Sequence, residues 1–309
     1  MSRSRLQARA QSLNLRVMTK PVYIHAGAHR TGTSSFQLCL YQNRKLLADK
    51  GFDLAYPSRD GVRGGKLRMP LPRMPHGEKR VPQFARQLRD RLAKLSPDPA
   101  RPLILSEENI PGPMRHFYVG RFFPASAKRL MTVAAALDGP PLHVIYVLRS
   151  YPELFASAFR KRSEDNKMPP FAEVVPRFLA MDRGWPDLVA QMRDLMKPAC
   201  LTILPYERRG ASRDLLSLLV PGLEGADLVE PDKTMNLSAT DAGLAALQMR
   251  YHAGETLKEK EWRQVIADHA EDRAPRGYAA FSGSDAQVLT DRYHADLEKI
   301  AQMPGVRFL

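Results

Sequence analysis

Short apolar runs alternate with amphipathic stretches along the first two thirds of the chain. The runs are nearly continuous in apolar residues, which indicates strands covered on both faces, and they lie at 21–26, 102–106, 142–148 and 199–204. The stretches between them have apolar residues at helical spacing and predict helices at 33–50, 84–95, 152–164, 185–196 and 212–220. This alternation predicts a three-layer α/β/α fold around a central parallel sheet with right-handed crossovers.

The rest of the pattern predicts a helical C-terminal part and one long irregular segment. We expect one helix to start near Ser238, which forms a capping-box-like pair with Asp241, and a last amphipathic helix at 285–302. Residues 57–82 are rich in glycine, proline and arginine and show no periodicity. A segment of this length is uncommon in a compact domain, so we interpret it as a functional loop or lid, or as disordered chain.

Length allows one large α/β domain or two small ones. The chain has 309 residues, of which 44% are hydrophobic and 26% charged, as is ordinary for a globular protein. No clear interdomain linker divides it, so residues 21–309 are expected to form a single α/β domain. Residues 1–20 contain basic and no acidic side chains, which suggests a disordered tail, a transit peptide, or a true start at Met18. Two cysteines and no apolar run of about 20 residues favour a cytoplasmic protein, including one peripheral to the inner membrane face. The net charge of +14 indicates anionic partners.

The stretch "YIHAGAHRTGTSSFQ", residues 23–37, carries the first chemical signal. Gly27 and Gly32 have the spacing of a Walker A phosphate loop, but the lysine that should follow Gly32 is missing and Arg30 stands inside the loop. Between a strand and a helix, such a loop binds anions through its backbone N–H groups and the helix dipole. Arg30 adds a two-pronged donor, and the hydroxyl donors are Thr31, Thr33, Ser34 and Ser35.

Two further groups of polar residues follow predicted strands. Arg149 ends the strand at 142–148, and Ser157 lies eight residues later in a predicted helix. Glu107 and Glu108 follow the strand at 102–106. Because ligands bind at the carboxyl ends of parallel strands, we expect these side chains to meet the loop at one edge of the sheet.

These motifs resemble the bacterial form of the sulfotransferases that use 3′-phosphoadenosine 5′-phosphosulfate, a family with a P-loop NTPase-like fold. The resemblance covers about residues 21–302, with Arg30 where the family usually has lysine. It implies transfer of a sulfuryl group to an acceptor hydroxyl or amine without a metal ion. Implied donor contacts are made by Gly27, Ala28, Arg30, Thr31, Gly32, Thr33, Ser34, Ser35, Arg149 and Ser157, and by Arg276 and Gly277 of a late R-x-G segment.

The acceptor side is less determined by the sequence. The resemblance makes Glu108 the expected base, with His29 and His25 as rival proton carriers, although His25 is equally well explained as a structural residue. Arg63, Arg68 and Glu107 are expected to contact the acceptor: a carbohydrate, a lipid or a small molecule, with an anionic glycan or lipid suggested by the basic segment. Two other functions stay open, a P-loop kinase and a binding protein for anionic polymers with an inactive nucleotide pocket.

Overall fold

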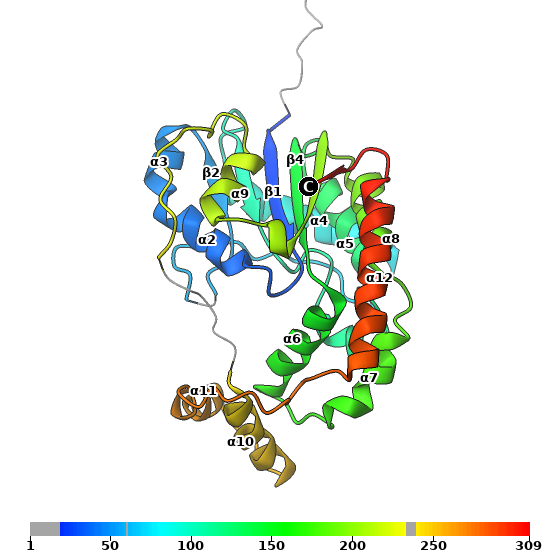
Figure 1. The fold of residues 1–309 in the computed structure, drawn as a ribbon. Coiled ribbons are helices and arrows are strands. Elements are labelled where there is room, and N and C mark those ends of the chain that lie inside the picture. The colour runs from blue at the N-terminus through cyan, green and yellow to red at the C-terminus, as the bar shows by residue number, and fades with distance from the viewer. Residues whose placement is uncertain (1–18, 60, 233–238) are drawn as a thin grey trace, which may run out of the picture.

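A six-stranded, all-parallel sheet forms the centre of the molecule (Figure 1). The computed structural model describes residues 19–59, 61–232 and 239–309. The sheet order is β2-β3-β1-β4-β5-β6, and its strands are β1 (Val22–Gly27), β2 (Asp53–Ala55), β3 (Leu103–Ser106), β4 (His143–Leu148), β5 (Cys200–Pro205) and β6 (Arg307–Phe308). The four predicted strands are therefore confirmed, and two short edge strands, β2 and β6, are added to them.

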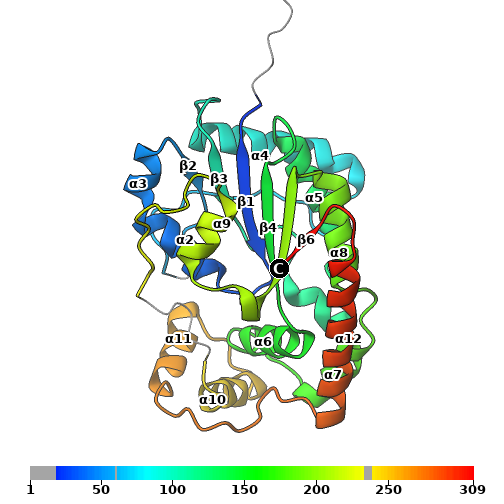
Figure 2. The ribbon, with the colours of Figure 1, turned by 45° about the horizontal axis from the view of Figure 1, so that its top comes forward.

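Helices cover both faces of the sheet (Figure 2). One face packs in a single apolar cluster with α2 (Thr33–Gln42), α3 (Arg44–Asp49) and α9 (Ser212–Leu219). The other face packs with α4 (Val81–Leu95), α5 (Ser126–Ala136), α6 (Tyr151–Ser163), α7 (Phe171–Leu179), α8 (Trp185–Gln191) and α12 (Gly283–Ala301). The predicted three-layer α/β/α arrangement is confirmed.

The last third is mainly helical, as the sequence predicts, but one helix starts later than expected. Helix α10 (Asp241–His252) is capped by Thr240, whose hydroxyl accepts from the N–H of Gly243 at 3.1 Å. The expected cap, Ser238, lies outside the described residues. Helix α11 (Glu259–Asp268) packs beside α10, and both lie beyond the carboxyl ends of the strands, near α6 (Figure 1).

Short helical turns complete the chain between these elements. Three are 3₁₀ turns and one is a π-helical turn that continues α8: η1 (Glu78–Arg80), η2 (Met114–Val119), η4 (Tyr206–Arg208) and the π-helical η3 (Met192–Met196). Most of residues 57–82 has no regular structure, in agreement with the irregular segment expected there. No helix in the described part of the chain is both long and apolar enough to cross a membrane.

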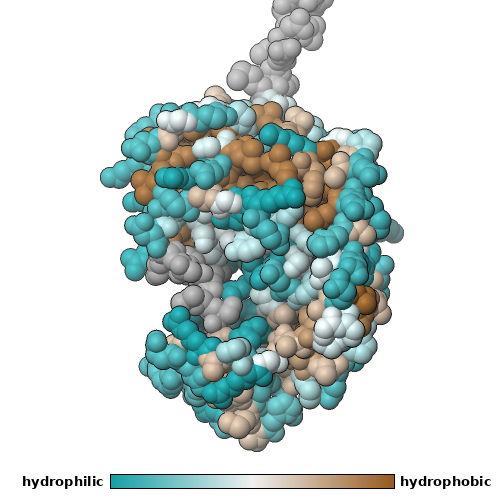
Figure 3. All heavy atoms as spheres, in the orientation of Figure 1, coloured by the Kyte–Doolittle hydropathy of each residue, from teal (hydrophilic) through white to brown (hydrophobic). Residues whose placement is uncertain are grey.

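Surface polarity differs between the two ends of the sheet. In Figure 3, hydrophobic surface gathers over the amino ends of β1 and β4 and over α9, whereas the end with α10 and α11 is mostly hydrophilic.

The chain leaves β1 toward α2 on one face and leaves β4 toward α6 on the opposite face. Neighbouring strands with this property form a crevice at their carboxyl ends, where α/β proteins bind ligands.

Candidate functional site

The loop after β1 is a tight, glycine-dependent turn into α2. A Cβ atom on Gly27 would lie 2.6 Å from the hydroxyl of Thr31, which donates a 2.7 Å hydrogen bond to the carbonyl of Ala28. Gly32 has a φ of 77°, and Arg30 has a φ of 69°, a left-handed conformation that is uncommon outside glycine. Both predicted glycines are therefore needed for the shape of the loop.

The first residue of α2 has a hydroxyl without a hydrogen-bond partner in the described part of the chain. Its first turn contains no acidic residue, and no side chain caps it. Thr33 is 2% exposed, and its hydroxyl has no hydrogen-bond partner among the described residues. A buried hydroxyl without a partner costs free energy, about 1–3 kcal/mol. The sequence-predicted hydroxyls Thr33, Ser34 and Ser35 thus lie at a helix start suited to an anion.

Two arginines from other strand ends hold the backbone of this loop. Arg149, directly after β4, donates to the carbonyl of Arg30 at 3.1 Å. Arg209, beyond β5, donates to the carbonyl of Gly32 at 3.2 Å and to the hydroxyl of Ser212 at 2.8 Å. Two neighbouring strands, β4 and β5, therefore each contribute a cation that contacts the loop.

Arg209 was not singled out by the sequence analysis. It lies so close to the loop that a Cβ atom on Gly32 would come within 3.0 Å of its Nε. That Nε is buried and has no partner among the described residues, and burial lowers the pKa of the guanidinium. The available signal was the sequence "LPYERR", which places two arginines just past the end of a buried strand.

The other residues that the sequence analysis expected to contact the sulfuryl donor lie in two separate places. Ser157 is half-buried on α6, two turns beyond Arg149. Arg276 is exposed, and its contacts are with two acids, one at the start of α10 and one just after α11: its N–H donates to Asp241 at 2.7 Å and its guanidinium to Asp272 at 2.5 Å. With Gly277, this segment borders a cavity of about 540 Å³ beside α6 and α10.

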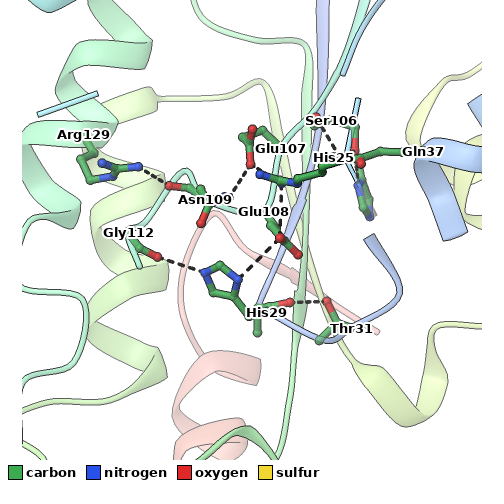
Figure 4. Close-up of polar contacts among 12 residues, drawn as sticks. His25, His29, Thr31, Gln37, Ser106, Glu107, Glu108, Asn109, Gly112 and Arg129 are labelled. Carbon is green, nitrogen blue, oxygen red and sulfur yellow. Dashed lines mark hydrogen bonds and ion pairs between the residues drawn. The ribbon is translucent and has the colours of Figure 1, made fainter. Parts of the chain in front are cut away.

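Glu108 and His29 form an ion pair beside the loop (Figure 4). His29 Nδ1 lies 3.7 Å from the carboxylate of Glu108, and His29 Nε2 lies 3.2 Å from the carbonyl of Gly112. Burial favours neutral His29, but the carboxylate and this carbonyl outweigh burial and raise the pKa of His29. The contact therefore favours the form with the proton on His29 and the negative charge on Glu108.

Opposing effects act on the pKa of Glu108. Burial alone raises it, but His29, Arg59 and Arg30 together lower the pKa of Glu108 to about 2. A carboxylate with so low a pKa is a weaker base in the ligand-free protein than the role expected of Glu108 calls for. The physical reason is that three cationic side chains converge on one carboxylate.

Glu107 anchors the long irregular segment 57–82. Its carboxylate accepts from Arg59 at 2.5 Å and from the N–H of Asn109 at 2.8 Å, and Arg59 also lies 3.3 Å from Glu108. Arg59 thus connects this segment to both glutamates, a contact that the sequence analysis did not predict. The side chains expected to contact the acceptor, Arg63 and Arg68, are exposed.

His25 is a structural residue rather than a proton carrier. Its ring stacks on Phe36 at 3.8 Å, and its Nδ1 lies 3.0 Å from the hydroxyl of Ser106. Complete burial, reinforced by Arg209, lowers the pKa of His25 well below its usual value. Of the two readings that the sequence left open for His25, this geometry supports the structural one.

Comparison with known proteins does not classify the chain. No protein-family model matches it, and no curated protein matches it either. Within the described residues, no group of three or more histidine, cysteine, aspartate or glutamate side chains is arranged to hold a metal ion. The geometry of the site is therefore the basis for any functional statement.

Proposed function

We propose that the protein is a sulfotransferase that takes its sulfuryl group from 3′-phosphoadenosine 5′-phosphosulfate. The observation that carries this proposal is the glycine loop without a Walker lysine, held by Arg149 at the β1–β4 crevice. A nucleoside triphosphatase uses that lysine with a magnesium ion to bridge two phosphates. A donor with one 5′-phosphosulfate and a separate 3′-phosphate has no such pair of phosphates.

The residues present fit both ends of this donor. Backbone N–H groups of the loop, Arg30 and the partnerless hydroxyl of Thr33 suit the 5′-phosphosulfate. Arg149, with Ser157 farther along α6, is assigned to the 3′-phosphate. We do not include Arg276 among the residues that bind the donor, because in this structure it is bonded to Asp241 and Asp272.

The transfer replaces the bond between sulfur and the donor oxygen with a bond between sulfur and the acceptor atom. The acceptor's oxygen or nitrogen forms a bond to sulfur while the bond from sulfur to the 5′-phosphate oxygen breaks, and that oxygen keeps the electron pair. Arg30 and the start of α2 stabilise the negative charge that grows there. The acceptor's proton passes to Glu108, which with His29 acts as one coupled acid–base unit.

The low pKa of Glu108 is consistent with this role once ligands are bound. Arg30, one of the cations that lower it, would be partly neutralised by an anionic donor. The pKa of Glu108 should then rise toward its ordinary value, since an opposite charge that is neutralised no longer favours the carboxylate.

A cytoplasmic location belongs to the same proposal, and it rests on Cys39 and Cys200, which are both free thiols.

Ligand-dependent thermal unfolding tests the function. We expect 3′-phosphoadenosine 5′-phosphate to raise the midpoint of unfolding, because it binds only the folded state, and ADP or ATP with magnesium to raise it less. The Arg30→Ala variant should transfer sulfate at least about tenfold more slowly than the wild type, which corresponds to about 1.4 kcal/mol of lost transition-state stabilisation. Stabilisation only by ATP with magnesium would instead indicate a kinase.

A further inference from the structure

A second cavity of about 580 Å³ lies beside the turn that follows Glu108. One wall is the segment from Met69 to His76, and the opposite wall contains Asn109, Pro113 and Arg115. Its volume is within the range of pockets that bind small organic ligands, about 300–1,000 Å³. The sequence analysis gave these residues no individual role, although 69–76 belong to the segment 57–82 that it interpreted as a functional loop or lid, or as disordered chain.

The charged side chains that line this cavity are all basic. They are Arg73, Arg115 and Arg129, joined by two histidines, and none of the described residues that line it is acidic. The guanidinium groups of Arg73 and Arg115 make no hydrogen bond or ion pair within the described part of the chain, and both residues are exposed. Two arginine forks at one cavity are well suited to a carboxylate or a sulfate group.

Arg129 adds a buried positive charge to the same place. It is 7% exposed, and its guanidinium donates to the carbonyls of Ile110, Pro72 and Asn109 rather than to a carboxylate. Burial lowers its pKa to about 10, so it stays charged at neutral pH. By tying the segment 69–76 to the turn after Glu108, it also fixes the two walls relative to each other (Figure 4 shows its contact with Asn109).

Apolar surface lines the rest of the cavity. Met69, Leu71 and Phe84 contribute to it, and the ring of His76 packs 5.1 Å from that of Phe84. A pocket that combines aromatic side chains with basic groups favours an organic anion that contains a ring over a simple inorganic anion.

The position of the cavity connects it to the proposed reaction. Asn109 and Pro113 lie in the turn whose Gly112 carbonyl contacts His29 and whose first residue follows Glu108. We propose that this cavity binds the acceptor, and that the acceptor carries a carboxylate or sulfate group held by Arg73 and Arg115. This inference rests on the proposed sulfotransferase function, which calls for an acceptor next to Glu108.

Matched neutral and anionic probes test the proposal. Calorimetry would compare phenyl β-glucuronide with phenyl β-glucoside, which differ by a carboxylate, in the presence of the 3′,5′-bisphosphate. We expect the wild type to bind the glucuronide at least about tenfold more tightly, and the Arg73→Gln/Arg115→Gln variant to lose this preference. The control Lys79→Gln/Arg86→Gln removes the same charge from the exposed surface of η1 and α4 and should keep it.

Several outcomes would separate the two proposals. Equal binding of the two probes by the wild type, or an unchanged preference in the Arg73→Gln/Arg115→Gln variant, would overturn the acceptor site. That variant should bind the bisphosphate as the wild type does, and a loss there would also count against a separate acceptor site. If the wild type preferred the glucuronide but did not bind the bisphosphate, the transfer function would be refuted while the anion selectivity of the cavity would be supported.

Discussion

The guanidinium of Arg209, which follows β5, supports the loop after β1. It holds the carbonyl of Gly32, the residue just before α2, and packs on that glycine. Arg209→Gln should therefore weaken binding of the 3′,5′-bisphosphate about tenfold, because the first N–H groups of α2 would no longer be held in place. Calorimetry measures this directly.

Two variants make the Arg209 result interpretable. Arg208→Gln removes the same charge from an exposed neighbour and should leave the affinity within about twofold, since long-range charge alone is strongly screened by salt. Arg209→Lys keeps the charge and should restore part of the affinity. An Arg209→Gln protein with wild-type affinity would show that this residue only packs against the loop.

The ion pair of Glu108 and His29 gives the protein a defined acid sensitivity. The pKa of Glu108 falls from 4.5 to about 2 on folding, so its contribution to stability is present above pH 4.5 and is lost as the pH falls toward 2. His29 has the opposite sign: its raised pKa stabilises the fold below pH 6.5, and this contribution is lost as the pH rises through the folded value.

Urea unfolding at two pH values tests this assignment. Between pH 6 and pH 3.5 the wild type should lose about 1 kcal/mol more unfolding free energy than Glu108→Gln, which follows from the two pKa values of Glu108. Glu173→Gln, at an exposed position on α7, serves as a control and should behave like the wild type. Parallel pH dependence in the wild type and Glu108→Gln would mean that the carboxylate is not held ionised by its neighbours.

At the scale of elements, the periodicity of apolar residues predicted where helices form but not where a distant contact interrupts one. The helix after the loop was expected to run from 33 to 50, but it breaks at Asn43 into α2 and α3. The side chain of Asn43 exchanges two 2.8 Å hydrogen bonds with the backbone of Val229, which is 186 residues away. No window of neighbouring residues contains that contact, so the break was not predictable from periodicity.

Short and irregular elements were missed for related reasons. β2 has three residues and β6 has two, and such lengths carry no alternation to recognise. Helix α7 contains Pro176, a residue that argues against a helix when it is read locally. The site shows the same division: the loop glycines were predictable from spacing, whereas Arg59 and Arg209 reach the site only through the tertiary fold.

The whole molecule places the two halves of the proposed donor site on opposite faces of the sheet. The loop leads into α2 on one face, and Arg149 leads into α6 on the other, where the side chain of Trp185 fixes the carbonyl of Arg149 at 3.0 Å. A ligand that spans the β1–β4 crevice would therefore connect two separately packed apolar clusters. Its binding should therefore slow local opening of helices on both faces of the sheet.

Hydrogen exchange can resolve these two halves. The 3′,5′-bisphosphate should slow exchange in the first turn of α2 and in the first turns of α6, because local opening becomes rarer wherever a bound ligand must be released first. Adenosine 5′-monophosphate, which lacks the 3′-phosphate, should protect α2 alone. Equal protection of α6 by both ligands would remove Arg149 and Ser157 from the 3′-phosphate site while leaving the loop as the 5′ site. Protection of neither helix by the bisphosphate would refute the donor assignment as a whole.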